Sequence, residues 1–265
     1  MYKIGFIGSG KMASALVSAL LKGGLTEAAS VVCSDVDPDR LDRLKEEFGV
    51  HVTSDNAEVL RRSEIVFLAF KPQNFPGAIA DLAGEVRPDH IIVSILAGIP
   101  IGRIRECLPG RVFRVMPNTA CLVGEMAGGF AAADDVCQAD REKVQAILRC
   151  AGSAVPVSEE ELDAVTGLSG SGPAFVAYLI DRFIAAGVAE GLAVEVATEL
   201  TLKTFEGTAQ LLAQWKLSPQ ELIEMVSSPN GTTVAGRGVL EESEVSDVIK
   251  RTVARAAQRS RELGK

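Results

Sequence analysis

The first residues that could do chemistry form the pattern Gly8-Ser9-Gly10-Lys11-Met12-Ala13, directly after a short apolar run at residues 4–7. Such a run leading into Gly-x-Gly-x-x-Ala is typical of a strand that turns sharply into a helix. Gly8 permits the turn, Gly10 lets a pyrophosphate approach the backbone, and Ala13 allows close packing of helix on strand. The unpaired N–H groups and the dipole at the helix start favour an anion. The pattern predicts a dinucleotide site; the alternative is a glycine turn that only packs.

Composition limits the class of protein. The 265 residues are 47% hydrophobic, enough for a substantial core in one large domain or two ordinary ones. A formal charge of −8 argues against a nucleic-acid surface. No apolar run approaches the roughly 20 residues that span a bilayer, and the N-terminus has the pattern of a strand and not of a signal peptide. We therefore expect a soluble, cytoplasmic protein.

Cysteine and histidine usage bears on metals and disulfides. The five cysteines form no Cys-x-x-Cys pair, and there are only two histidines. This disfavours disulfides and zinc, so we expect buried, reduced thiols and no metal site. His51 is expected to be an ordinary residue at a strand end, because no partner at metal-ligand or catalytic spacing lies near it in the sequence.

A second candidate site is the end of the apolar run at residues 31–34, which leads to Asp35. A carboxylate at this spacing would accept hydrogen bonds from the ribose hydroxyls of NAD(H) and repel the 2′-phosphate of NADP(H). Ser34 and Arg40 could instead donate to a phosphate there. Asp37-Pro38 then predicts a helix start, and Gly49 its end.

Strands and helices continue to alternate: a strand at residues 50–53, a helix near 57–61, and apolar strands at 65–70 and 91–95. Uniformly apolar strands suit a parallel sheet covered on both faces, so we predict a doubly wound, mostly parallel α/β sheet of the Rossmann type. Ligands bind outside the carboxyl ends of such strands. Those ends are Ala69-Phe70-Lys71-Pro72, Leu96-Ala97-Gly98 and Val115-Met116-Pro117-Asn118-Thr119. Together they predict loops that line one side of a cofactor site. The alternative is that each loop contains Pro or Gly only because the chain must turn there.

From Ser158 onward the pattern becomes helical, beginning with a capping box from Ser158 to Glu161. We predict a Rossmann domain over residues 1–157 and an all-α domain for substrate binding and oligomerisation over 158–265. The helix expected from Pro173 is apolar around nearly its whole circumference. A domain of about a hundred residues can hardly cover such a helix, so we expect a partner subunit to cover it.

Two loops stand out in this half. The loop at 166–173 lacks the Gly-Lys-Ser/Thr ending of a nucleotide P-loop, which leaves packing and ligand contact both open. The loop at 227–233 follows a helix at 218–226, which Ser218 and Glu221 should cap. It offers hydroxyls and free N–H groups at the start of another helix, a cradle for a small carboxylate. The alternative is a turn that only joins two helices.

Four motifs taken together resemble one family. They are Gly-Phe-Ile-Gly-Ser-Gly-Lys-Met-Ala at 5–13, Phe-Arg-Val-Met-Pro-Asn-Thr at 113–119, Gly-Leu-Ser-Gly-Ser-Gly-Pro-Ala at 167–174 and Ser-Ser-Pro-Asn-Gly-Thr-Thr at 227–233. In order and content the chain resembles pyrroline-5-carboxylate reductases to past residue 240. The resemblance implies a Rossmann domain and a helical domain that interleaves with a partner, as a homodimer or a pentamer of dimers. It also implies reduction of 1-pyrroline-5-carboxylate to L-proline by NAD(P)H, the last step of proline biosynthesis.

The resemblance also assigns residues to the site. The substrate residues it implies are Ser228, Gly231, Thr232 and Thr233, with the Thr233 hydroxyl at the ring nitrogen and nearest the chemistry. Reducing a protonated cyclic imine needs positioning more than a strong acid. With the second-strand residues included, the expected cofactor contacts are Ile7, Gly8, Ser9, Gly10, Lys11, Met12, Ala13, Ser34, Asp35, Asn56, Ala69, Phe70, Lys71, Pro72, Ala97, Gly98, Met116, Pro117, Asn118 and Thr119.

The chain departs from this family at a few positions. Asp35-Val36 stands where many relatives carry Asn-Arg or Ser-type residues, Asn230 where glycine is common, and Arg237 where an aliphatic residue is usual. The family usually prefers NADPH, whereas Asp35 predicts that NADH is used as well or better.

Two alternative functions stay open at this stage. The first is another NAD(P)-dependent imine or β-hydroxyacid oxidoreductase. A β-hydroxyacid dehydrogenase would need a lysine on the first long helix of the second domain, and none occurs between Lys143 and Lys203. A nucleotide-sensing protein without turnover is the second alternative.

Overall fold

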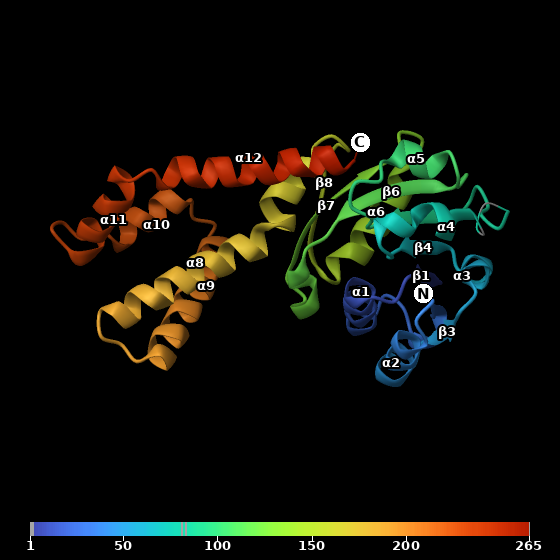
Figure 1. The fold of residues 1–265 in the computed structure, drawn as a ribbon, viewed down its shortest axis with the longest axis horizontal. Helices are drawn as coiled ribbons and strands as arrows, with labels where there is room; N and C mark the ends of the chain where they lie inside the picture. The colour runs from blue at the N-terminus through green and yellow to red at the C-terminus, as the bar shows by residue number, and fades with distance from the viewer. Residues whose placement is uncertain (1–2, 81, 83, 265) are drawn as a thin grey trace. The chain divides into compact units, whose positions relative to one another are not determined.

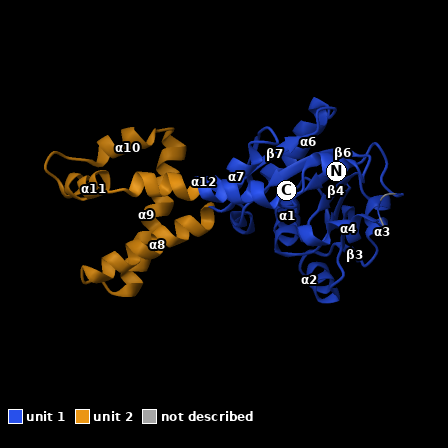
Figure 2. Cartoon of the chain, turned by 45° about the horizontal axis from the view of Figure 1, so that its top comes forward, with its two compact units in different colours: residues 1–171, 254–265 blue, residues 172–253 orange. Residues whose placement is uncertain are grey.

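The computed structural model describes residues 3–80, 82 and 84–264. The chain forms two compact units, one of residues 1–171 with 254–265 and one of residues 172–253 (Figure 2). The predicted boundary at residue 158 differs from this division. Helix α7 (Leu162–Val165) and the π-helical turn η4 (Thr166–Gly170) stay with the first unit. The reason is packing, because Leu162 is buried in the core of that unit and α7 contacts two of its strands, β6 and β7.

The first unit is built on one eight-stranded sheet in the order β3-β2-β1-β4-β5-β6-β7-β8 (Figure 1). All neighbours are parallel except the antiparallel pair β6 and β7. This confirms the doubly wound, mostly parallel fold. The strands are β1 (Ile4–Ile7), β2 (Val31–Ser34), β3 (His51–Thr53), β4 (Ile65–Leu68), β5 (Ile91–Ser94), β6 (Arg111–Met116), β7 (Met126–Ala132) and β8 (Gly152–Pro156).

Helices and short turns connect these strands, and α7 and η4 follow the last strand. The helices are α1 (Lys11–Lys22), α2 (Pro38–Phe48), α3 (Asn56–Arg62), α4 (Phe75–Ala80), α5 (Ile101–Arg105), α6 (Gln138–Arg149) and α7, with short turns at η1 (Ala28–Ser30), η2 (Pro72–Asn74), η3 (Thr119–Val123) and η4. The α2 signals are confirmed: Asp37 accepts from the Asp39 N–H, and Gly49 ends the helix with φ +68°. The predicted reciprocal bonds between Ser158 and Glu161 also form.

The core lies between this sheet and its helices. β1, β2, β4 and β5 are buried along their whole length, and the rings of Phe6 and Phe67 stack with centroids 4.8 Å apart. Burial on both faces explains why these strands are uniformly apolar.

Several sequence expectations need correction at this level. The strand predicted to reach Phe70 ends at Leu68, which leaves Ala69 and Phe70 in the loop. The strands β7 and β8 were not predicted, since the glycines of Met126–Ala132 weaken the strand signal and β8 includes Gly152 and Pro156, residue types that are rare in strands.

The second unit contains α8 (Gly172–Ala189), α9 (Val194–Trp215), α10 (Pro219–Val226), α11 (Thr232–Glu242) and the first part of α12 (Val245–Leu263). α8 packs on α9, with the rings of Phe183 and Phe205 edge to face at 5.4 Å. No residue of α8 is buried, and Tyr178 is 65% exposed. The chain by itself thus leaves this apolar helix uncovered.

No run of membrane-spanning length was expected, but the helical stretch at residues 162–189 is long and apolar enough by length and composition alone. One such helix is weak evidence for a membrane span. Asp181 and Arg182 lie within it and pair with each other. An uncovered subunit interface explains the same composition.

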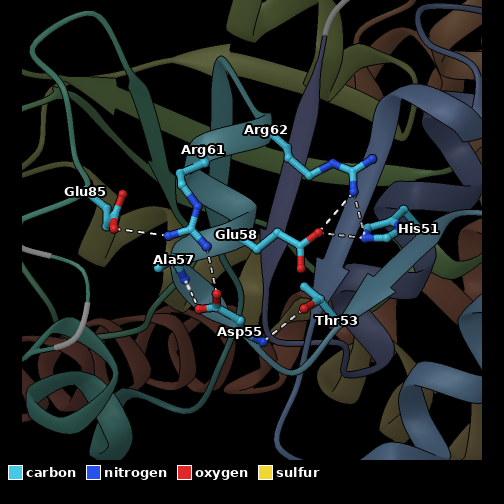
Figure 3. A network of polar contacts seen from close by, with 8 residues as sticks. All are labelled: His51, Thr53, Asp55, Ala57, Glu58, Arg61, Arg62 and Glu85. Atoms are coloured by element: carbon cyan, nitrogen blue, oxygen red, sulfur yellow. Dashed lines mark hydrogen bonds and ion pairs between the residues drawn. The ribbon is translucent and has the colours of Figure 1, made fainter.

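The edge strand β3 is tied to α3 by a polar cluster (Figure 3). His51 Nε2 lies 2.9 Å from Glu58 Oε1, and Arg62 Nη1 lies 3.0 Å from the same oxygen. His51 therefore has a carboxylate partner that its sequence surroundings did not suggest. Hydrogen bonds from Thr53, Arg62 and His51 lower the pKa of Glu58 to about 2.

We expect this cluster to stabilise the protein in a pH-dependent way. Because the folded-state pKa of Glu58 lies below the usual value, its contribution is present above about pH 4.5 and declines as the pH falls toward 2. The substitution Glu58→Gln should lower Tm at pH 6 by an amount equivalent to about 1 kcal/mol, and by less at pH 3.5. Thermal unfolding at both pH values measures this. Glu46→Gln on the exposed face of α2 is the matched control, and a Glu58→Gln effect that does not shrink at pH 3.5 would contradict the expectation.

Candidate functional site

The candidate cofactor site begins at the turn between β1 and α1. Gly8 has φ +100°, and a Cβ there would lie 2.6 Å from the carbonyl oxygen of Ala69. Only glycine fits this turn. A Cβ on Gly10 would meet nothing within 4 Å, so open space lies over the loop at that point. Ala13 is fully buried under the start of the helix.

The start of α1 is suited to an anion. Its N-cap is Gly10, and no side chain in the described part of the protein caps the first turn. The first N–H groups of a 12-residue helix therefore point outward without a side-chain acceptor. Together with the helix dipole, they fit the pyrophosphate of a dinucleotide.

Backbone hydrogen bonds bring three strand ends together at this turn. Gly8 N donates to Ser34 O at 2.8 Å, and Ala69 N donates to Ile7 O at 2.8 Å. The carboxyl ends of β2, β1 and β4 thus lie side by side, where the strand order reverses. This is the position at which open α/β sheets bind dinucleotides.

Asp35 lies directly beside the glycine loop. Its Oδ2 accepts from Ser9 N at 2.7 Å and its Oδ1 accepts from Asp37 N at 3.0 Å. Arg40 Nη1 lies 3.5 Å from the same Oδ2, while Arg40 Nε pairs with Asp37. The Asp35 carboxylate therefore already holds the loop, and an arginine partly neutralises it.

Ser34 is placed differently from what a direct phosphate contact would need. Its side chain is completely buried, and its hydroxyl donates to Asn56 Oδ1 at 2.6 Å. Asn56, the first residue of α3, is only half-buried. In this arrangement the Ser34 hydroxyl orients Asn56 and does not face solvent.

The next two strand ends differ in exposure. Lys71 is exposed and Ala69, Phe70 and Pro72 are half-buried, so the loop after β4 offers both charge and apolar surface. After β5, Ala97 is exposed but Gly98 is buried. A Cβ on Gly98, which has φ +76°, would lie 2.9 Å from the carbonyl oxygen of Leu263 in α12.

At the end of β6, Asn118 makes one hydrogen bond inside the protein with each end of its side-chain amide. Its Nδ2 donates to Ser169 O in η4 at 3.1 Å, and its Oδ1 accepts from Ala127 N at 3.1 Å. Met116 is half-buried and lies near Gly170 of the same π-helical turn, whereas Pro117 is buried and Thr119 exposed. Sequence reasoning missed Ser169 as a partner, because nothing local marks a contact between residues so far apart in the chain. Asn118 thereby joins η4 to the end of β6; the stretch 166–173, expected to be a loop, consists of this π-helical turn and the start of α8.

The candidate substrate loop lies in the helical unit. Gly231 N donates to Ser228 O at 3.0 Å, and Asn230 has φ +59°. Pro229 before a residue of positive φ gives the pattern of a type II turn. Asparagine is one of the few residues with a side chain that tolerates this left-handed conformation.

The turn leads directly into α11, whose N-cap is Gly231 and which has no side-chain cap. Thr232 and Thr233 are its first two residues, and both are exposed. A Cβ on Gly231 would lie 2.5 Å from Ser228 Oγ and 3.0 Å from the Ser228 carbonyl oxygen, so a larger residue here would require Ser228 to shift. Hydroxyls and free N–H groups thus converge at a helix start, an arrangement that can bind a carboxylate. One turn further on, Arg237 Nε lies 3.0 Å from Glu241 Oε1.

The described residues offer no metal-binding cluster at the cofactor or substrate loop, and the buried thiols are weak acids. Among the described residues no group of three His, Cys, Asp or Glu side chains could hold a metal ion. All five cysteines are free thiols, and burial raises the pKa of Cys33 to about 12 and that of Cys121 to about 11. Cys33 and Cys121 are therefore packing residues and not nucleophiles, whereas Cys137 is exposed, which corrects the expectation that all the thiols are buried.

A glycine turn at the switch point of a doubly wound sheet, joined in sequence to a helical unit, is the arrangement of a dinucleotide-binding protein, a class that includes the nicotinamide-dependent oxidoreductases. Comparisons with known proteins give the particular family. A family model described as pyrroline-5-carboxylate reductase dimerisation matches residues 159–263, and one described as NADP oxidoreductase, coenzyme F420-dependent, matches residues 3–98.

Whole-chain similarities agree with these models. The chain is 40% identical to the pyrroline-5-carboxylate reductase of Methanosarcina acetivorans, over 99% of this chain and 98% of that protein. It is 36% identical to the Arabidopsis thaliana enzyme, over 99% and 95%.

Among solved structures, a pyrroline-5-carboxylate reductase from Coxiella burnetii matches with a TM-score of 0.95 and 30% identity, over 100% of this chain and 99% of that one. The Plasmodium falciparum pyrroline carboxylate reductase with NADP bound matches with a TM-score of 0.87 and 27% identity, over 100% and 98%.

The chain belongs to the pyrroline-5-carboxylate reductase family. It is an NAD(P)H-dependent oxidoreductase that reduces 1-pyrroline-5-carboxylate to L-proline, the last step of proline biosynthesis, and its helical region is a dimerisation domain. Neither alternative function is favoured by these relatives, and α8, the first long helix of the helical unit, carries no lysine.

Proposed function

We propose that the reaction is carried out by two sets of residues, one in each unit. The glycine loop Ile7 to Ala13, Asp35, Asn56 and the loops after β4, β5 and β6 hold NAD(P)H, which supplies the hydride when bound. Ser228, Gly231, Thr232 and Thr233 hold the substrate. The cofactor residues are supported by one observation: hydrogen bonds join the carboxyl ends of β1, β2 and β4 at the uncapped start of α1.

Some of the cofactor residues act indirectly in this proposal. The hydroxyl of Ser34 and the amide of Asn118 are both used inside the protein, so Ser34 orients Asn56 and Asn118 orients the end of β6. Contacts with the cofactor at Asn118 would then come from the backbone.

The substrate loop acts through geometry and not through a strong acid. The N–H groups at the start of α11 bind the substrate carboxylate, and the Thr233 hydroxyl bonds the ring nitrogen. The imine carbon is already electrophilic once its nitrogen is protonated, so the hydroxyl needs only to orient the ring. Its support is the exposed Thr233 at the second position of an uncapped helix.

We further propose that NADH is used at least as well as NADPH. The Asp35 carboxylate, whose side chain is only 6% exposed, has lone pairs beyond those used by Ser9 and Asp37 for the ribose hydroxyls. A 2′-phosphate would face this carboxylate. Arg40 softens the repulsion, because it already lies 3.5 Å from Asp35.

We also propose that the enzyme is a homodimer or a pentamer of dimers and works in the cytoplasm. The apolar, unburied α8 supports association through the helical unit. The free thiols suit a reducing compartment, and cell fractionation would test the location.

The substitution Thr233→Ala should lower kcat/KM for the imine by about 10- to 1000-fold, as expected for losing one or two positioned hydrogen bonds to a charged substrate. Steady-state kinetics at saturating cofactor measure this. Thr233→Ser keeps the hydroxyl and should retain most of the activity. If a folded Thr233→Ala enzyme keeps near-normal kcat/KM, Thr233 is not in the site.

Cofactor preference is tested by kcat/KM for NADH and NADPH in the wild type and in Asp35→Asn. The substitution removes the charge but keeps an acceptor for the Ser9 N–H. It should shift the ratio toward NADPH by about one to three powers of ten, because like charges about 4 Å apart cost roughly 1 to 4 kcal/mol. Arg40→Ala should shift it toward NADH. A wild type that favours NADPH with a ratio unchanged in Asp35→Asn would exclude Asp35 as the ribose reader.

The mass in solution tests the assembly. Light scattering at micromolar concentration should give at least twice the chain mass of 28.0 kDa. Tyr178→Asp on the exposed face of α8 should weaken association, since a charge would replace an aromatic contact. Asp134→Asn, exposed in the other unit, is the control. A wild-type mass equal to one chain would exclude the proposed assembly.

A further inference from the structure

The last turns of α12 belong to the nucleotide-binding unit, although the helix begins in the helical unit. Ala257 and Ser260 are buried, at 6% and 7% exposure. Ser260 Oγ donates to Asp163 Oδ1 in α7 at 2.5 Å. The end of the chain is thus seated on the nucleotide-binding unit by both packing and a hydrogen bond.

Beyond Ser260 the chain meets the turn after β5 through its backbone. The contact is tight in both directions: a Cβ on Gly98 would lie 2.9 Å from Leu263 O, and a Cβ on Gly264 would lie 3.4 Å from Gly98 O. Gly264 N donates to Ser260 O, which keeps this end of the helix wound. The backbone of Gly98 therefore packs against residues 263–264 at the end of α12, and its neighbour Ala97 is exposed to solvent.

A second contact fixes the chain just after the Ala97–Gly98 turn. Ile101 N, just beyond it, donates to Glu159 Oε1 at 2.7 Å, and Arg114 Nη1 lies 3.3 Å from that oxygen. The left-handed turn at Gly98 thus lies between two fixed points, Glu159 and Leu263. Glycine is the most flexible residue, so without one of these contacts the turn would sample other conformations.

We propose that the end of α12, residues 260–264, is a positioning element for the dinucleotide: it holds the Ala97–Gly98 turn so that Ala97 stays presented at the carboxyl edge of the sheet. This rests on the proposed cofactor site. A turn that is already ordered adds no ordering cost when the cofactor binds, whereas a released turn lowers the observed affinity. A tail that serves only stability would instead lower Tm without selecting cofactor over imine.

The test is a chain that ends at Glu262, compared with a chain that ends at Gly264. The shorter chain lacks the Leu263 carbonyl that Gly98 contacts but keeps the bond between Ser260 and Asp163. We expect its Kd for NADH and NADPH, from fluorescence titration, to rise about 3- to 30-fold. KM for the imine at saturating cofactor should stay within about 2-fold, and Tm within a few degrees.

A second pair of variants does not depend on truncation. Ser260→Ala should raise the same Kd values by about 2- to 10-fold, and Ser260→Thr, which keeps the hydroxyl, should restore them. Gly98→Ala should weaken cofactor binding in the full chain, and by a smaller factor in the chain ending at Glu262, because part of its clash is with Leu263. Fully additive effects would contradict the direct contact.

Gly8→Ala separates this inference from the proposed site, since a Cβ there would meet the Ala69 backbone at the heart of the dinucleotide turn. If Gly8→Ala weakens cofactor binding while the chain ending at Glu262 and Ser260→Ala bind as the wild type does, the positioning role is overturned and the site stands. If Gly8→Ala also leaves the Kd for NADH and NADPH unchanged, both the proposed cofactor site and the positioning role are wrong.

Discussion

The backbone turn at Gly8 is the constraint on which the nucleotide-binding unit depends. Its left-handed conformation sets the Gly8 Cα against the carbonyl of Ala69, so β1 and β4 can approach only if residue 8 has no side chain. The turn is then tied to β2 through Ser34 O and the Asp35 carboxylate. Because three strand ends share this one loop, the opening for a cofactor is fixed by main-chain geometry and not by flexible side chains.

The proposed substrate site in the second unit resembles the glycine loop in its backbone. At the start of α11 a type II turn with a left-handed Asn230 leads into an uncapped helix start, as the glycine loop does at α1. Both proposed sites would thus rely on backbone N–H groups and helix dipoles, which need no titration. This suits a reaction that adds hydride to a cation already made electrophilic, for which orientation matters more than proton transfer.

The two units differ in how they bury their apolar residues. The nucleotide-binding unit buries its apolar strands, whereas α8 leaves Tyr178 and Phe183 more than half exposed. An apolar face of this kind is stable in water only when another surface covers it. Residues 159–263 match a family model of pyrroline-5-carboxylate reductase dimerisation, which indicates that a second subunit covers this face. The helical unit is therefore completed by assembly and not by its own core.

The sequence by itself determined the features that depend on local chemistry and period. These are the glycine turn, the apolar strands, the helix caps at Asp37 and Ser218, the reciprocal hydrogen bonds between Ser158 and Glu161, which precede α7 and do not cap it, and the uncovered helix from Pro173; each arises from residues close together in the chain. Only the tertiary structure decided which groups are free to act. The Ser34 hydroxyl is used by Asn56 and the Asn118 amide by Ser169, while Gly98 lies under the end of α12. The unit boundary at 171 and the return of residues 254–265 were decided in the same way. Such contacts join residues far apart in the chain, and no local period or propensity encodes them.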